Sequence, residues 1–218
     1  MSYTRVQEHQ DGLAPAEMSA TPARVGPNAV IQLAIVLQLR LGEVRARAVF
    51  ARAGFAPMLD DLPDEMVDER IPAALFSALF AELDAETAAS IAEEAGFATA
   101  DYIMANRIPG FARTLLKILP GPLAAPLLTK AIAQHSWTFA GSGAFSAAPG
   151  SPIVVEIADN PLAMPGCAWH RAVFERLYRS LVSPRTTVTH ASCCHDGAPA
   201  CRFTIDISGG GPSRASAS

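Results

Sequence analysis

The chain has 218 residues, of which half are hydrophobic and 17% are charged, so we expect one substantial hydrophobic core and no extended disorder. The net charge of −4 and the sequence pI near 5.7 predict no nucleic-acid partner. The mean hydropathy of +0.22 is high, which favours a buried apolar pocket or contact with a membrane surface.

Neither a signal peptide nor a membrane span is expected. The N-terminal sequence MSYTRVQEHQDG is polar and has no hydrophobic region. The best apolar run, residues 30–39, contains two glutamines and ends at Arg40, whereas a span needs about 20 apolar residues. The sequence therefore predicts a cytoplasmic protein, in which cysteines are usually reduced.

The composition divides the chain into three parts. Residues 1–22 are polar without apolar periodicity, and we expect a flexible arm. Residues 208–218, SGGGPSRASAS, have the composition of a flexible tail. Residues 23–207 are expected to form a single α+β domain.

The first part of this domain is predicted to be helical. Asn28 is expected to cap a helix that stops at Gly42, and a further helical segment stops at Gly54. Asp84 is expected to cap a helix over residues 85–95, with Gly96 after its end. Apolar spacing predicts additional helices over residues 71–83, 100–107, 111–119 and 123–134.

After His135 the pattern changes to that of strands. Residues 153–157 are a β-branched run, and residues 186–192 and 201–207 alternate with a period of two. A helix is expected over residues 167–182, before the last two strands. The fold class is therefore α+β, with an N-terminal helical part followed by a small antiparallel sheet and one helix packed on it.

The segment CCHDGAPAC joins the last two predicted strands. Cys193 and Cys201 would stand at its two ends and face Cys167 at the start of the preceding helix. Three converging thiolates suit tetrahedral zinc, but free cysteines are also commonly buried as small hydrophobic side chains, so both interpretations stay open. The fourth ligand would come from the loop, as Asp196, His195 or Cys194.

Two histidines are adjacent to tryptophans. His135 ends a predicted helix just before Trp137, and His170 lies next to Trp169 in the helix over residues 167–182. An imidazole at either place could bind a metal or a metal-bearing ligand, although histidines near helix ends are also common as structural caps.

Several cofactor and catalytic motifs are missing from the sequence. We find no G-x-G-x-x-G opening a helix, no P-loop, no G-x-S-x-G elbow and no H-E-x-x-H. The sequence therefore predicts no nicotinamide or flavin site, and its catalytic residues are unknown.

The last third of the chain resembles the vinyl-4-reductase domain family. The resemblance rests on the pattern C-x3-G-x3-C-R-F, which begins at Cys193 and follows a helix and a strand. It covers about residues 145–207. Residues 25–34 and 137–157 also resemble members of this family that take part in bacteriochlorophyll synthesis.

The resemblance implies a fold similar to the haem-sensor and vesicle-tethering superfamily, whose members often hold an apolar ligand. Related sensor domains bind zinc through cysteines, which implies a structural zinc on Cys167, Cys193 and Cys201. Those domains have a further cysteine where this chain has Asp196, so the fourth ligand departs from the pattern. For a Mg-tetrapyrrole, the candidate binding residues are His135, Trp137, Trp169 and His170, with either histidine as the axial ligand.

Three functions follow from the resemblance. The first is a protein of bacteriochlorophyll biosynthesis that binds a Mg-tetrapyrrole intermediate and shields it or delivers it to pathway enzymes. The second is a reductase of the vinyl group of a divinyl (proto)chlorophyllide, for which no hydride-donor site is visible. The third is a small-ligand sensor or interaction module. Pathway enzymes are the expected partners, a homodimer is one option, and the photosynthetic membrane is an expected peripheral location.

Overall fold

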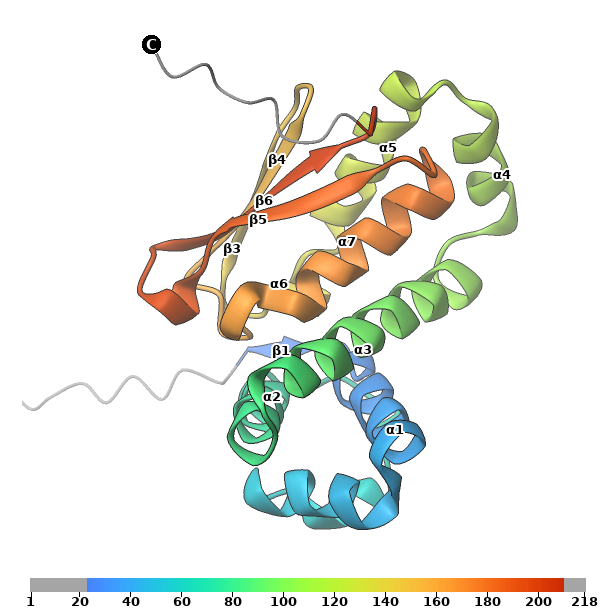
Figure 1. The fold of residues 1–218 in the computed structure, drawn as a ribbon. Coiled ribbons are helices and arrows are strands. Elements are labelled where there is room, and N and C mark those ends of the chain that lie inside the picture. Colours follow the sequence, from blue (N-terminus) through green and yellow to red (C-terminus); the bar gives the residue numbers. More distant parts are fainter. Residues whose placement is uncertain (1–22, 210–218) are drawn as a thin grey trace, which may run out of the picture.

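The computed structural model describes residues 23–209. The predicted arm, residues 1–22, and all but the first two residues of the predicted tail lie outside this range. The described chain has a helical part at one end and a sheet with its own helices at the other (Figure 1). The α+β class expected from the sequence is confirmed.

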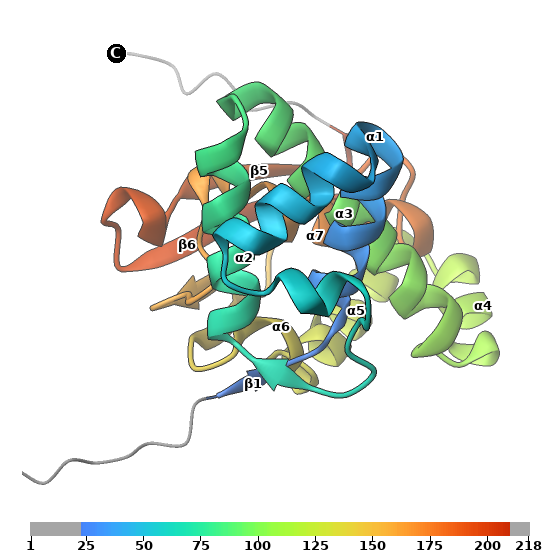
Figure 2. The same cartoon turned by 90° about the horizontal axis from the view of Figure 1, so that it is seen from below.

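The helical part contains three helices and one small strand pair. Its elements are β1 (Arg24–Val25), α1 (Asn28–Arg52), η1 (Ala56–Leu59), β2 (Val67–Asp68), α2 (Arg70–Glu82) and α3 (Ala85–Asn106). Strands β1 and β2 pair antiparallel. Figure 2 shows α1, α2 and α3 together in front of the sheet part.

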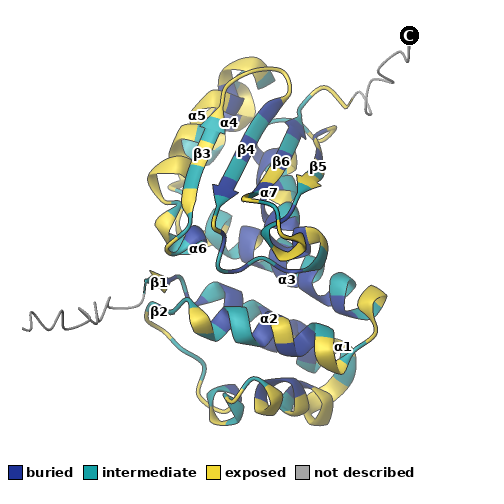
Figure 3. Ribbon diagram, turned by 90° about the vertical axis from the view of Figure 1, so that its left-hand side faces the viewer, coloured by how far each residue is buried: buried dark blue, intermediate teal, exposed yellow. Residues whose placement is uncertain are grey.

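The second part begins with helices and ends with the sheet. Its elements are α4 (Gly110–Ile118), α5 (Gly121–Gln134), α6 (Trp137–Ala140), β3 (Ala144–Ala148), β4 (Ile153–Ala158), η2 (Pro165–Cys167), α7 (Ala168–Leu181), β5 (Thr187–Ser192), η3 (Cys194–Asp196) and β6 (Ala200–Asp206). The four strands pair antiparallel in the order β3-β4-β6-β5, and α5 and α7 lie behind the sheet in Figure 3.

The strand alternation that the sequence predicts is present in the sheet. Ile157 of β4 lies opposite Cys201 of β6, and both are buried toward the helices. On the other face, Glu156 lies opposite Arg202 and forms an ion pair with it. One face of this sheet thus belongs to the core, whereas the other is polar.

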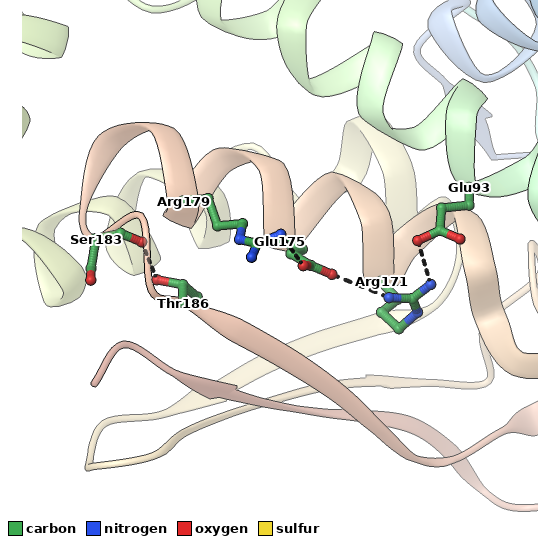
Figure 4. A network of polar contacts seen from close by, with 6 residues as sticks. All are labelled: Glu93, Arg171, Glu175, Arg179, Ser183 and Thr186. Carbon is green, nitrogen blue, oxygen red and sulfur yellow. Dashed lines mark hydrogen bonds and ion pairs between the residues drawn. The ribbon is translucent and has the colours of Figure 1, made fainter. Parts of the chain in front are cut away.

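Helices α3 and α7 join the two parts of the molecule. Arg171 of α7 donates to Glu93 of α3 over 2.8 Å and to Glu175 over 3.1 Å, and Arg179 donates to Glu175 over 2.8 Å (Figure 4). The chain leaves α7 through a turn in which the Thr186 hydroxyl donates to a backbone carbonyl. A second ion pair, between Arg176 of α7 and Asp101 of α3 over 2.8 Å, joins the same two helices.

Several predicted helix boundaries are confirmed and others are wrong. Asp84 caps α3, accepting a hydrogen bond from the Thr87 backbone N–H over 2.9 Å. Gly42, with φ of 79°, interrupts α1 at the place where the first helical segment was expected to stop. Gly54, with φ of 85°, follows the C-terminal end of α1. Asn28 is not a cap: it is the first residue of α1, and its side chain caps nothing.

Gly96 does not end a helix, because α3 continues through it to Asn106 and includes the helix predicted over residues 100–107. A side chain at Gly96 would place its Cβ 2.5 Å from the Trp169 carbonyl oxygen of α7. The absence of a side chain at Gly96 therefore allows α3 and α7 to pack closely.

The start of α7 also differs from the prediction. Helix α7 begins at Ala168, one residue later than predicted, because Cys167 has a left-handed backbone with φ of 44°. Within residues 23–209, no helix combines the length and the apolar content needed to span a bilayer.

Candidate functional site

Three buried cysteines meet where α7 begins against the sheet. Cys167 precedes α7, Cys193 follows β5, and Cys201 lies on β6. The Sγ of Cys167 is 3.2 Å from the Sγ of each of the other two, and the sulfurs of Cys193 and Cys201 are 3.9 Å apart. None of the three forms a disulfide. We call these three residues the cysteine centre.

Polar groups converge on Cys201 within this centre. Its sulfur accepts hydrogen bonds from the backbone N–H of Cys194 and from Nδ2 of Asn160, each over 3.3 Å. Asn160 is itself buried, and its Oδ1 accepts from the Leu162 backbone N–H over 3.0 Å. Sequence reasoning missed Asn160, since the Asn-Pro pair at that position signals only a loop.

These hydrogen bonds shift the pKa values of Cys201 and Cys167 in opposite directions. The thiol of Cys167 donates to Cys201 and, with the other donors, lowers the pKa of Cys201 to about 3. The same hydrogen bond and burial raise the pKa of Cys167. The hydrogen bonds therefore favour the thiolate form at Cys201 over that at Cys167, and the nearby His190 also lowers the pKa of Cys201.

The cysteine centre has the donor set of a zinc site. Thiolates bind zinc at about 2.3 Å in a tetrahedron, and its edges are then about 3.8 Å long. The three sulfurs lie within 4.8 Å of one another, so small movements would bring them to that spacing. All three ligands are buried and all are cysteines, as in many structural zinc sites, but a tetrahedral ion would need one more ligand.

The predicted fourth ligands lie outside this trio. Asp196 and His195 are exposed on η3, and Cys194 is half-buried with its sulfur 3.8 Å from the Ile157 carbonyl oxygen. The structure thus brings together three of the four predicted zinc ligands, and Asp196 is not beside them.

The candidate tetrapyrrole residues fall in two separate places. His170 and Trp169 are buried between α7 and its neighbours, with ring centroids 4.8 Å apart. The His170 Nε2 lies 3.3 Å from the Phe139 carbonyl oxygen, while its Nδ1 and the Trp169 Nε1 have no hydrogen-bond partner in the described part of the chain. Burial lowers the pKa of His170 to about 4, so this imidazole is neutral.

The other two candidates are on the surface. His135 is exposed at the end of α5, where its Nδ1 lies 2.9 Å from the Ala131 carbonyl oxygen. Trp137 is exposed at the start of α6. Two of the four candidates are therefore buried and two are exposed, and they do not line one common pocket.

An apolar groove lies between α5 and the β3–β4 hairpin. Its volume is about 540 Å³, and it is open to solvent. Apolar side chains and backbone dominate its walls, with four polar side chains: Thr129, Lys130, Ser146 and Ser151. The Thr129 hydroxyl is 2.6 Å from the hydroxyl of Tyr178, and burial raises the pKa of Tyr178 to about 12, so the phenol is neutral.

Sequence reasoning did not find this groove. Its walls come from α5, from β3 and the following turn, and from Ile207 after β6. No local motif marks residues that are far apart in the sequence, and none of them is a histidine, cysteine or acid.

The fold and site define an α+β domain with a buried cysteine centre and an open apolar groove. No family model matches the chain. Two relatives are similar over most of its length, and both are named bacteriochlorophyll synthase 23 kDa chain. The relative from Cereibacter sphaeroides is 44% identical over 191 residues, which cover 84% of this chain and 90% of the relative. The relative from Rhodobacter capsulatus is 41% identical, covering 91% of this chain and 93% of the relative.

The chain belongs to the family of bacteriochlorophyll synthase 23 kDa chains. This membership supports the predicted role in bacteriochlorophyll biosynthesis. The resemblance to the vinyl-4-reductase domain family stays a prediction.

Solved structures with related architecture are more distant. One is an H-NOX protein from S. oneidensis in the Fe(II)NO ligation state, at 9% identity and a TM-score of 0.46 over 84% of this chain and 99% of that chain. Another, described under "Modulating Heme Redox Potential Through Protein-Induced Porphyrin Distortion", has 10% identity and a TM-score of 0.48 with the same coverage. Similarity at this level carries no argument about function.

Proposed function

We propose that this protein binds a Mg-tetrapyrrole intermediate of bacteriochlorophyll biosynthesis and delivers it to a pathway enzyme. The observation that carries the proposal is the apolar groove between α5 and the β3–β4 hairpin. Family membership indicates the pathway to which the ligand belongs, since both relatives are named as chains of bacteriochlorophyll synthase. A pathway enzyme is accordingly the proposed partner.

The groove suits a large flat ligand. Ligand pockets commonly have volumes of about 300–1,000 Å³, and the groove falls in this range. Its apolar walls would cover the faces of a macrocycle, and Lys130 would pair with a carboxylate side chain of the ligand. Because the groove is open, a bound pigment would stay accessible to the enzyme that receives it.

The chemistry of magnesium favours an oxygen ligand in this groove. Magnesium is a hard cation, and the hydroxyl groups of Thr129, Ser146 and Ser151 are side-chain oxygens that line the walls. The earlier candidates His135 and His170 do not line the groove. A tetrapyrrole with His135 or His170 as its axial ligand would therefore have to bind outside this groove. The role of these two histidines stays a prediction.

The proposal is tested by titrating the purified protein with a divinyl Mg-tetrapyrrole and recording absorption spectra. In Ala133→Trp, an indole would fill the groove, and we expect binding at least about tenfold weaker, as for a blocked pocket. Ala131→Trp is the matched control, because Ala131 is exposed on the same helix but does not line the groove. The absence of a spectral change with the wild-type protein would rule out the carrier function.

The same experiment addresses the reductase function. Reduced nicotinamide is added to the bound complex, and the products are analysed for loss of the vinyl group. Binding without reduction is the result that we expect, since no nicotinamide or flavin motif is present in the sequence. Stoichiometric vinyl reduction by the purified protein would replace the carrier function with the reductase function.

The cysteine centre supports a second part of the proposal, a structural zinc. Cys167, Cys193 and Cys201 would hold the ion and so fix the start of α7 to β5 and β6. Zinc would stabilise the thiolates that burial otherwise disfavours. The alternative is close packing of three sulfurs without a metal, and a measurement of metal content distinguishes the two.

A further inference from the structure

Helix α4 exposes apolar side chains along one side. Phe111, Leu115 and Ile118 are spaced by four and three residues and therefore lie on one face of the helix. Their exposed fractions are 77%, 51% and 74%, and the one buried residue of α4 is Leu116. A helix that packs its apolar face on its own core would show the reverse pattern.

The neighbouring helix α5 also exposes apolar side chains. Leu123 and Leu127, one turn apart, are also exposed, whereas the opposite side of α5 packs into the core. Helices α4 and α5 are joined by two residues and contact each other. In Figures 1 and 3 they lie at the outer edge of the sheet part, with largely exposed surfaces. We define the α4–α5 face by its five apolar residues: Phe111, Leu115, Ile118, Leu123 and Leu127.

The chain segment that contains this face carries charges of a single sign. Residues 102–155 contain four basic residues and no aspartate or glutamate, although the whole chain has a net charge of −4. The four are Arg107, Arg113, Lys117 and Lys130. Elsewhere, exposed arginines such as Arg47 and Arg176 pair with carboxylates, but none of these four does so within residues 23–209. Arg113 donates to the Met104 carbonyl oxygen instead.

We propose that the α4–α5 face docks on an anionic lipid bilayer. Exposed apolar side chains beside unpaired basic groups are the combination that inserts shallowly among acyl chains while contacting lipid phosphates. A protein partner would have to supply both acidic groups and an apolar surface that covers Phe111 and Ile118, whereas an anionic bilayer supplies both. None of the five apolar residues of the α4–α5 face lines the groove, and of the four basic residues only Lys130 does, so bilayer docking through this face does not depend on tetrapyrrole binding.

Vesicle flotation tests the proposal with the full chain. We expect the wild-type protein to float with vesicles of phosphatidylcholine mixed with phosphatidylglycerol, and much less with phosphatidylcholine alone. The double variant Phe111→Ser/Ile118→Ser should lose flotation. The matched control is Leu39→Ser/Val44→Ser on α1, because these side chains are equally exposed (79% and 82%) but lie in the helical part, away from the basic region.

A second variant addresses the charges without altering the groove. Arg107→Ala/Lys117→Ala should weaken binding to the anionic vesicles by about fivefold per charge, as expected for basic groups at a lipid surface. High salt should also weaken the binding of the wild-type protein to anionic vesicles, because salt screens the attraction between its basic side chains and the lipid phosphates. Neither residue lines the groove, so tetrapyrrole binding by this variant separates the two proposals.

Three results would overturn the proposal. The first is a wild-type protein that does not float with anionic vesicles. The second is flotation that survives Phe111→Ser/Ile118→Ser while circular dichroism shows the variant folded. The third is a dimer that this variant dissociates, combined with no vesicle binding, which would make the face a contact between two copies of the chain.

Discussion

At the scale of single residues, Cys201 is the member of the cysteine centre best prepared to bind a metal ion, because its sulfur accepts the hydrogen bonds that favour a thiolate. We expect about one zinc per chain in protein purified without chelator, as for a structural site. Cys201→Ser should lose this zinc and on the order of 4 kcal/mol of unfolding free energy, as is typical when a metal site is removed. Plasma emission spectroscopy and urea denaturation measure the two quantities.

Cys194→Ser is the control for this prediction. Its sulfur lies outside the trio, so the variant should keep both zinc and stability. A wild-type protein that is fully stable without zinc would favour simple burial of the three sulfurs. Loss of zinc in Asp196→Ala would instead show that the exposed loop folds over the centre.

His170 gives the protein a defined dependence of stability on pH. Burial lowers the pKa of His170 from 6.5 to about 4, although the hydrogen bond with the Phe139 carbonyl and, to a lesser degree, Cys201 oppose this shift. Between those two values the unfolded chain binds a proton that the folded chain does not, so stability falls as the pH falls. At about 1.4 kcal/mol per pH unit, the loss approaches about 3 kcal/mol at pH 4.

Urea denaturation from pH 7.5 to pH 4 measures this loss, and His170→Gln should remove it, since glutamine cannot be charged. Above pH 6.5 the difference between variant and wild type should stay constant, which provides an internal control. Exposed carboxylates contribute in a lower range: Arg70 lowers the pKa of Asp68 to about 2, and that stability is lost only below about pH 4. A wild-type curve that is flat between pH 6.5 and pH 4 would contradict the prediction.

At the scale of elements, Gly96 sets how closely α3 and α7 approach. A Cβ at this position would lie 2.5 Å from the Trp169 carbonyl oxygen and 2.8 Å from the Ala172 Cβ, so α7 would have to move. We therefore expect Gly96→Ala to cost about 3 kcal/mol in urea denaturation, despite the better helix propensity of alanine. Gly110→Ala, where the nearest neighbouring atom is 3.8 Å away, should change the stability by less than about 1 kcal/mol.

The same glycine shows why some elements could be predicted and others could not. Strand alternation around Cys201 and the cap at Asp84 are local signals, and both are confirmed. A glycine in a helical pattern usually suggests an end, but at Gly96 a helix from another part of the chain determined the residue. Tertiary packing therefore overrode the local preference.

In the candidate site, too, the residues fixed by local sequence patterns could be predicted, whereas those brought together by distant segments could not. The positions of Cys193 and Cys201 could be inferred from the hairpin, because alternation fixes the faces of two adjoining strands. Asn160 and the groove depend on contacts between segments that are far apart in the sequence, which no periodicity reveals. The exposed position of Asp196 depends on how the loop folds, and the turn residues alone did not determine it.

At the scale of the whole molecule, one continuous core crosses both parts of the chain. Buried residues of α1, α2 and α3 belong to the same cluster as those of the sheet and α7. The Trp169 ring of α7 lies 6.0 Å from the Phe76 ring of α2 between centroids, so the contact between the two parts includes large aromatic side chains. An apolar interface of this kind favours cooperative unfolding of residues 23–207 as one domain.

The two tryptophans allow this cooperativity to be measured. Trp137 is exposed, so Trp137→Phe should fold normally and leave Trp169 as the only indole reporter, placed where the two parts meet. We expect the urea midpoint from the fluorescence of this variant to coincide with the midpoint from far-ultraviolet circular dichroism, which follows all helices. If the fluorescence changed at a lower urea concentration than the helix signal, the two parts would separate before they unfold. The chain would then consist of two domains, and the α3–α7 contact would be a docking interface between them.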